Sequence, residues 1–231
     1  MPDRPQLLSV IIPVFNEQTT IGEVIEKVIA VELPIAKEII VVDDGSTDGT
    51  VEEIERRRPN VAAIHVAELN EGKGSAVRIG MGLAKGDVML IQDADLELDP
   101  NEYASLLEPV LAGRVKAVYG SRFLGRSRVK LSRRIPNYVL TFITNLLYGT
   151  RLTDMGTAYK VFDAELAGQF RLRAKRFDID PEITAQITML GYEIEEVPIS
   201  YRPRTRNEGK KIRWLDGFAA IRTLLVNRFR V

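Results

Sequence analysis

Residues 87–95 read Asp87-Val88-Met89-Leu90-Ile91-Gln92-Asp93-Ala94-Asp95. The apolar run is typical of a strand buried in a sheet, and two carboxylates one residue apart stand at its end. Asp93 and Asp95 therefore predict a site for a divalent cation at the tip of this strand. One ion can join both side chains only if the chain turns, because on a straight strand they lie about 7 Å apart. The segment from Leu96 to Pro100 favours such a turn; the alternative is a solvated Asp-rich loop.

The sequence on both sides of this stretch alternates between strand and helix patterns. Runs of apolar, largely β-branched residues predict strands at 7–15, 38–42, 61–66, 87–92 and 117–120. Apolar residues at helical spacing predict helices at 21–29, 48–58, 76–84 and 101–111. This alternation favours right-handed βαβ crossovers and a mostly parallel central sheet with helices on both faces, which is an α/β fold.

The carboxyl ends of parallel strands share one rim of a sheet, and ligands bind there. Polar residues follow four of the predicted strands, at Asn16-Glu17, Asp43-Asp44, 70–74 and 93–95. Their convergence on one rim favours the metal-site interpretation of the last group. Asp44 suits a ribose hydroxyl or the base edge of a nucleotide, although the Asp43-Asp44 pair could instead cap the next helix.

The segment Asn70-Glu71-Gly72-Lys73-Gly74-Ser75 precedes a predicted helix. Its glycines and Lys73 resemble a phosphate-binding loop, but the four-residue gap between the glycines of the NTPase motif is missing. An NTPase P-loop is thus disfavoured, and a plain turn with a solvated lysine remains an open interpretation.

After residue 121 the regular alternation ends. The remaining predicted segments are a basic loop at 121–134, an apolar helix at 138–148, a loop leading into a strand at 154–162, a helix at 181–190, an extended segment at 194–201, a second basic loop at 201–211 and a final helix at 214–229. Pro198 suggests that the extended segment lies at a sheet edge. Because no repeat, low-complexity tract or linker interrupts the chain, residues 1–231 are predicted to form a single domain.

The composition restricts the chemistry. The chain has no cysteine, which excludes disulfides and thiolate sites, and its one histidine, His65, lies in a predicted strand. Oxygen ligands remain, and these favour Mg²⁺ or Mn²⁺. No apolar stretch reaches about 18 residues and the first residues lack the apolar segment of a signal peptide, so we expect a cytoplasmic protein.

Charge is distributed unevenly along the chain. Residues 1–108 carry 21 acidic and 9 basic side chains, whereas residues 109–153 carry nine basic side chains and no acidic one. An acidic half that suits a metal is thus joined to a basic half that suits anions. Little aromatic interleaving argues against nucleic acid, so phosphorylated metabolites or a lipid-phosphate surface fit better. Arg122 follows a predicted strand directly and should reach the same rim, although basic loops can also be solvated faces.

Taken together, the motifs resemble those of family 2 glycosyltransferases with the nucleotide-diphospho-sugar transferase (Rossmann-like) fold, in particular the dolichol- or polyprenyl-phosphate hexose (mannose or glucose) synthase group. The resemblance covers nearly the whole chain. The motifs that carry it lie, in order, at 10–17, 41–50, 70–74, 92–97, 120–123, 154–162 and 208–211.

The resemblance implies a donor, GDP-mannose or UDP-glucose, and an acceptor, a polyprenyl or dolichyl phosphate. The donor nucleotide would contact Pro13, Asn16, Glu17, Asp44 and Lys73. Asp93 and Asp95 would bind Mg²⁺ or Mn²⁺ bridging the donor diphosphate, with Gln92 beside them. The acceptor phosphate is already ionised, so it would attack the anomeric carbon with inversion and without a general base.

Further roles follow from position within this resemblance. Arg122, Arg133 and Arg134 would bind the acceptor phosphate, and Arg204, Lys210 and Lys211 would bind the donor diphosphate through a loop that closes over it. Asp93, Asp95 and Arg122 would form the catalytic set. Asp154, Thr157, Asp180 and Glu182 would line the sugar pocket, and Asp180 or Glu182 would become a general base if the acceptor were a hydroxyl.

Residues 1–120 would then form the nucleotide-binding half and residues 121–231 the acceptor-binding half. Peripheral contact with the cytoplasmic face of a membrane would depend on the helix around 139–147 and on the amphipathic C-terminal helix, unless both merely pack on the sheet. A soluble glycosyltransferase acting on a hydroxyl of a metabolite or glycan is the alternative enzyme. A binding module for nucleotide sugars or nucleic acid is the non-enzymatic alternative.

Overall fold

The computed structural model describes the backbone at residues 6–125, 131–204 and 214–229, and the side chains at 6–125, 135–204 and 217–229. Its strands are β1 (Leu7–Val14), β2 (Ala36–Asp43), β3 (Ala63–Val66), β4 (Val88–Ile91), β5 (Ala117–Ser121), β6 (Lys160–Asp163) and β7 (Ile194–Pro198). Its helices are α1 (Ile21–Ala30), α2 (Thr50–Glu55), α3 (Lys73–Leu83), α4 (Tyr103–Leu111), α5 (Leu131–Tyr148), α6 (Ala164–Ala167), α7 (Ile179–Met189) and α8 (Trp214–Phe229), with short 3₁₀ turns at Arg58–Asn60 and Pro100–Glu102.

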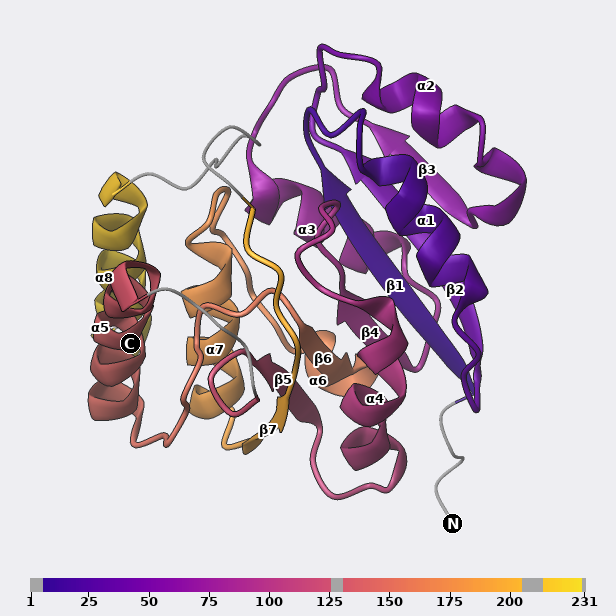
Figure 1. The fold of residues 1–231 in the computed structure, drawn as a ribbon. Helices are drawn as coiled ribbons and strands as arrows, with labels where there is room; N and C mark the ends of the chain where they lie inside the picture. The colour runs from indigo at the N-terminus through magenta and orange to yellow at the C-terminus, as the bar shows by residue number, and fades with distance from the viewer. Residues whose placement is uncertain (1–5, 126–130, 205–213, 230–231) are drawn as a thin grey trace.

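The seven strands form one sheet in the order β3-β2-β1-β4-β6-β5-β7 (Figure 1). All neighbouring pairs are parallel except those of β6, which runs antiparallel to β4 and β5. The sheet is therefore mostly parallel, and the predicted α/β fold is confirmed. Pro198, at the end of the edge strand β7, lies opposite Ser121, as expected for a proline in a sheet.

Helices cover both faces of the sheet because side chains alternate along each strand. Val10 and Ile12 of β1 pack into a core with α1 and α4, whereas Ile11 packs into a second core with α3, α6 and α7. Figure 1 shows α5 and α8 side by side at one end of the molecule, beyond α7.

The direction of β6 brings the loop before it, residues 154–159, to the rim of the sheet where β4 ends. Lys160, the first residue of β6, lies opposite Ile91 at the carboxyl end of β4 and opposite Tyr119 near the end of β5. The loop before an antiparallel strand arrives where its parallel neighbours end, so residues 154–159 reach the same rim as Asp93. The sequence predicted this strand but not its direction.

The predicted basic loop at 121–134 differs from the structure, and helix α6 at Ala164–Ala167 was not predicted. Helix α5 begins at Leu131, so residues 131–134 belong to a helix rather than to a basic loop. Pro136 is the sixth residue of this helix, where a proline cannot donate the backbone hydrogen bond that other interior residues of a helix donate.

Candidate active site

The carboxyl ends of β1, β2 and β4 meet at one rim, as the parallel register requires. Asp93 and Asp95 stand there, and each contacts a cation from elsewhere in the chain. The Nζ atom of Lys73 lies 2.7 Å from Oδ1 of Asp93, and a guanidinium nitrogen of Arg204 lies 3.5 Å from Oδ2 of Asp95. Both carboxylates keep part of their surface, with 30% and 20% of the side chain exposed.

Negative charge is concentrated at Asp95. Burial, reinforced by the neighbouring charges of Asp93 and Glu97, raises the pKa of Asp95 to about 7, although Arg204 opposes the shift. Such crowding of anions is relieved by a hard cation with oxygen preference. Two carboxylates are also a usual protein contribution to a Mg²⁺ site that is completed by substrate phosphates and water. The residues present therefore fit a divalent cation, and within the described segments no cluster of three or more His, Cys, Asp or Glu side chains offers a closed metal cage.

A chain of alternating charges leads away from Asp93 into the core. Lys73 lies 3.9 Å from Asp180, and the fully buried Lys160 lies 2.8 Å from the other oxygen of Asp180. The Lys160 ammonium also donates to the carbonyl oxygens of Thr157 and, at 3.2 Å, Met155. The chain thus connects the motif at β4 with the loop before β6.

The ionisation of the Lys160–Asp180 pair follows from these contacts. Burial raises the pKa of Asp180, but Lys160 and Lys73 outweigh it, and the pKa lies below its ordinary value. Burial lowers the pKa of Lys160. With Asp180 and two carbonyls as acceptors and a raised pKa at Lys73, the group functions as a charged network in which Asp180 is an anion.

Arg204 is held at the rim by two acidic side chains. Its guanidinium forms a fork with Glu17, at 3.0 and 2.8 Å, and its backbone N–H donates to Glu97 at 2.7 Å. The other oxygen of Glu97 accepts from the Tyr201 hydroxyl at 3.0 Å. Glu17 and Arg204, both predicted to contact the donor, therefore bind each other, and Glu97 sets the position of the segment that carries Arg204.

The loop at 70–75 is fixed by Asp44 and by close backbone packing. The buried Asp44 carboxylate accepts from the Asn70 amide at 2.8 Å and from the N–H groups of Glu71 and Gly72 at 3.0 and 2.8 Å. Gly72 has φ +111°, and a Cβ there would lie 2.4 Å from the carbonyl oxygen of Lys175. The glycine in this motif thus has a packing explanation, and Asp44 orients the loop that delivers Lys73.

Two of the predicted donor contacts lie inside the protein. Gln92 is fully buried, its carbonyl oxygen accepts from the hydroxyls of Tyr103 and Tyr159 at 2.6 and 2.8 Å, and its amide donates to the carbonyl of Asp93. The side chain thus supports the Asp93 turn from inside the protein, and its predicted contact with the donor stays a prediction. Pro13 is likewise buried, and it pairs with Val42 one residue before the carboxyl end of β1.

Asn16 closes the rim at the end of β1. It is the one described non-glycine residue with positive φ, +49°, and its side-chain oxygen accepts from the N–H of Thr47 at 2.8 Å. The side chain therefore connects the ends of β1 and β2, a conformation that Asn tolerates better than most residues.

Arg122 is held at the other end of the rim by Asp154. Nε and Nη2 of Arg122 donate to the two oxygens of Asp154, each at 2.7 Å, and its backbone N–H donates to the same carboxylate at 3.0 Å. Nη2 also donates to the carbonyl of Gly156 at 2.9 Å. Asp154 is fully buried, and it accepts a further bond from Asn137 of α5 at 3.0 Å. Asp154 thus anchors Arg122, and its predicted place in the sugar pocket stays a prediction.

Thr157 and Glu182 differ in what they offer a ligand. Glu182 is almost fully buried and accepts from the backbone N–H groups of Arg173 and Ala174 at 2.9 and 2.7 Å. Its predicted place in the sugar pocket stays a prediction. The hydroxyl of Thr157 is buried and has no hydrogen-bond partner among the described residues. An unpartnered hydroxyl at the rim can receive a polar ligand group.

The side chains of four basic residues predicted to bind phosphate lie outside the described part of the structure. Lys210 and Lys211 lie outside the described residues, and the side chains of Arg133 and Arg134 lie outside the described part of α5. Their assignments to the donor diphosphate and to the acceptor phosphate stay predictions.

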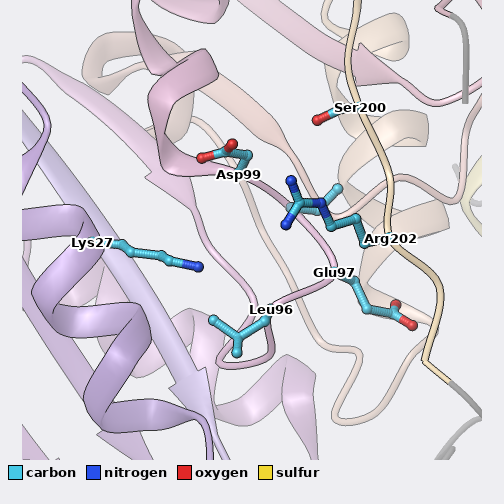
Figure 2. Close-up of a pocket in the computed structure, with 7 residues that line it drawn as sticks. Lys27, Leu96, Glu97, Asp99, Ser200 and Arg202 are labelled. Carbon is cyan, nitrogen blue, oxygen red and sulfur yellow. The ribbon is translucent and has the colours of Figure 1, made fainter.

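A small pocket lies between α1, residues 96–99 and the segment at 200–202 (Figure 2). Its lining residues are Lys27, Leu96, Glu97, Leu98, Asp99, Ser200 and Arg202. In Figure 2 the carboxylate of Glu97 points away from this pocket, in agreement with its bonds to Tyr201 and Arg204. The pocket is therefore a gap between residues 96–99 and the segment at 200–202.

Three residues at the site were missed by sequence reasoning: Lys160, Glu97 and Asn137. Only Lys160 carried a usable signal, because a lysine at the start of a buried strand requires a buried anion as partner. Nothing in the sequence pairs Glu97 with Arg204, or Asn137 with Asp154, since each contact joins separate elements.

Known proteins resemble the chain over most of its length. It is 28% identical over 226 residues to an undecaprenyl-phosphate mannosyltransferase of Micrococcus luteus, covering 91% of this chain and 90% of the relative. It is 27% identical over 208 residues to a dodecaprenyl-phosphate galacturonate synthase of Rhizobium johnstonii, covering 88% of this chain but only 61% of that relative. A glucosyl-3-phosphoglycerate synthase of Mycobacterium tuberculosis, solved with Mn²⁺, UDP and phosphoglyceric acid, superposes with a TM-score of 0.73 over 97% of this chain and 79% of that one, at 21% identity, and supports the fold alone.

The family itself follows from the match of residues 9–171 to the model for Glycosyl transferase family 2. These residues include β2 to β6, all but the first two residues of β1, and the rim residues Asp93, Asp95 and Arg122. The sequence resemblance is thereby confirmed: the chain belongs to glycosyl transferase family 2.

Proposed function

We propose that the protein transfers a hexose from a nucleotide diphosphate sugar, GDP-mannose or UDP-glucose, to the phosphate of a polyprenyl or dolichyl phosphate, with inversion at the anomeric carbon. Two relatives named for undecaprenyl and dodecaprenyl phosphate support a lipid phosphate acceptor. The charge arrangement supports it too, with a carboxylate pair at one end of the rim and Arg122 at the other.

The observation that carries this proposal is the state of Asp180 and Glu182. A hydroxyl acceptor needs a general base whose pKa lies near the working pH and whose carboxylate can reach the substrate. Asp180 is held ionised by two lysines with its pKa below the ordinary value, which makes it a weak base. Glu182 is buried against two backbone N–H groups. A phosphate acceptor needs no base, so with Asp95, whose pKa is raised to about 7, assigned to the metal, the state of these two carboxylates favours a phosphate over a hydroxyl.

The side chains of this protein divide the work between the two anions. Lys73 and Arg204 flank the Asp93-Asp95 pair and are placed to bind the donor diphosphate. When bound at this pair, Mg²⁺ or Mn²⁺ would neutralise charge on the departing nucleotide diphosphate. Arg122, oriented by Asp154, is placed to position the acceptor phosphate, and it lies close enough to act electrostatically on Asp180. Positioning and charge compensation are the main catalytic contributions of such a site.

The direct test is a transfer assay with labelled GDP-mannose or UDP-glucose, Mn²⁺, and a short-chain polyprenyl phosphate in detergent. We expect label in the organic phase and a β-linked product from an α-linked donor, as read by NMR of the sugar phosphate. Parallel reactions with soluble hydroxyl acceptors test the alternative. Turnover of a soluble acceptor with no labelled lipid would overturn the proposal.

A further inference from the structure

Helix α5 is built with its polar side inward and its apolar side outward. Among its buried side chains are Thr141 and Thr144, 3% and 0% exposed. Its exposed side chains include five large apolar ones at helical spacing: Ile135, Tyr138, Val139, Phe142 and Leu146. A helix on the surface of a globular protein normally shows the opposite arrangement.

The inward polar side is explained by the loop before β6. Asn137 accepts from the N–H of Gly156 at 3.1 Å and donates to Asp154 at 3.0 Å. One turn further, Thr141 accepts from the N–H of Met155 at 3.1 Å. At the next turn Asn145 exchanges two bonds with Leu152, at 2.8 and 2.9 Å. The polar residues of α5 thus hold the loop that orients Arg122, and the outward apolar residues have no such explanation.

Helix α8 adds a second exposed apolar stripe beside the first. Phe218, Leu225, Val226 and Phe229 are exposed, at 64%, 41%, 38% and 72%. The two helices pack together, and the Tyr148 hydroxyl at the end of α5 donates to the carbonyl of Leu224 at 2.6 Å. Single exposed apolar residues are ordinary, but a set that covers two adjacent helices marks a contact surface. The exposed apolar residues of α5 and α8 are called the α5–α8 face below.

The charges around this face select its partner. The described side chains of α5 and α8, at 135–148 and 217–229, include no acidic residue, whereas Arg222 and Arg228 are exposed. In the sequence, the whole stretch 109–153 contains nine basic residues and no acidic one. Apolar side chains flanked by arginines, with no acidic side chain at 135–148 or 217–229, complement a lipid surface that carries negative head groups. A protein partner would not require one sign of charge throughout.

We propose that the α5–α8 face docks on an anionic membrane and that α5, through Asn137, Thr141 and Asn145, connects this membrane contact to the loop that orients Arg122. The inference rests on the proposed function, because docking would bring the active site to a lipid phosphate acceptor held in the membrane. The docking itself depends only on the face and is measured without donor, acceptor or metal.

The test is flotation of the full chain with vesicles of phosphatidylcholine alone or with about a third phosphatidylglycerol. We expect binding to the anionic vesicles, weakened by salt, and little binding to the neutral ones. The variant Phe142→Ser with Leu146→Ser should lose about tenfold or more in vesicle affinity, because two side chains that enter the lipid are removed. The matched control is Leu83→Ser with Met189→Ser, which removes exposed apolar side chains outside the face and should bind as the unaltered chain does.

A second pair of measurements separates docking from catalysis. With a short-chain polyprenyl phosphate in detergent, the Phe142/Leu146 variant should turn over normally, and with the same acceptor in vesicles it should be slow. Normal detergent turnover also shows that the variant is folded. If the unaltered chain transfers no sugar to any lipid phosphate yet binds anionic vesicles, the proposed function fails and the docking inference stands.

Three results would overturn the docking inference. The first is no binding of the unaltered chain to either vesicle, and the second is equal binding to neutral and anionic vesicles. The third is vesicle affinity unchanged in the Phe142/Leu146 variant. If light scattering shows that the unaltered chain is a dimer and this variant a monomer, with no vesicle binding by either, the face is a self-association surface and the inference is again wrong.

Discussion

Carboxylates at the two ends of the rim do different work. At one end, called the donor end after the proposed function, Asp93 and Asp95 keep part of their surface exposed. Each faces the cationic tip of a long side chain, Lys73 or Arg204. At the other end, called the acceptor end after the proposed function, Asp154 is fully buried. Its carboxylate accepts three hydrogen bonds from Arg122 and one from Asn137. The first arrangement leaves anions available to a ligand, whereas the second uses an anion as a scaffold for a cation. A mutation at the donor end should therefore cost activity, and one at the acceptor end should cost stability.

The largest effect on activity is expected for Asp93→Asn. Removing half of the carboxylate pair should lower the transfer rate by about 10²- to 10³-fold, because the compensation of diphosphate charge is lost in the transition state. The measurement is the rate of hexose transfer at saturating Mn²⁺. Asp99→Asn is the control, since Asp99 only accepts from Asn101 at the adjacent 3₁₀ turn. Equal rates for Asp93→Asn and the control would remove the donor end from the mechanism.

The melting temperature of Asp95→Asn tests whether Asp95, unlike Asp154, is kept for a ligand rather than for the fold. Burial and the charges of Asp93 and Glu97 disfavour the ionised Asp95, so its neutral replacement should leave the melting temperature in chelator unchanged or higher. The stabilisation that Mn²⁺ and nucleotide diphosphate together give the unaltered chain should disappear. A lower melting temperature in chelator would mean that Asp95 is a scaffold like Asp154.

The largest effect on stability is expected for Asp154→Asn. It leaves the enclosed guanidinium of Arg122 without its counter-charge, which should cost about 3 to 5 kcal/mol of unfolding free energy. Urea unfolding measures the loss. Glu108→Gln is the matched control, because it breaks the exposed pair with Arg114 and should leave the unfolding free energy nearly unchanged. A cost for Asp154→Asn as small as that of the control would refute the scaffold role.

An intermediate effect is expected where the two ends connect, at Lys160. Lys160→Met removes the closest cation from the buried Asp180 and leaves Lys73 3.9 Å away, which should cost about 2 to 4 kcal/mol of unfolding free energy. Adding Asp180→Asn should recover part of that loss, since the unpaired anion is then gone. The double-mutant cycle in urea reports the coupling, and additive single effects would mean that the charged network does not act as a unit.

How far the sequence determined this site depends on the distance over which each contact acts. Strand and helix patterns are local, so the strand ends with Asn16, Asp44 and Asp93 could be predicted to share a rim. The direction of β6 could not, because parallel and antiparallel strands with buried faces have similar apolar patterns. Consequently the sequence indicated the loop at 154–159 but not the reason why it reaches Asp93.

The partners of the carboxylates were the other part that could not be predicted. Glu17 and Arg204 are 187 residues apart, and Asp154 and Arg122 are 32 apart. A carboxylate looks the same in the sequence whether it binds a metal, orients an arginine or caps backbone N–H groups. The sequence therefore could not show that Glu182 accepts from two backbone N–H groups or that Gln92 bonds the carbonyl of Asp93.

The smallest structural effect is expected for Thr157→Val. The Thr157 hydroxyl is buried without a partner among the described residues, so replacing it with a methyl group of similar size should change the unfolding free energy by less than about 1 kcal/mol, or stabilise the protein. If the hydroxyl serves a ligand, KM for the donor or the acceptor should rise about tenfold while stability holds. Serine is the matched replacement and should keep KM near that of the unaltered chain. Unchanged KM values for Thr157→Val would leave the acceptor end with Arg122 as its polar contact and would exclude Thr157 from the sugar pocket.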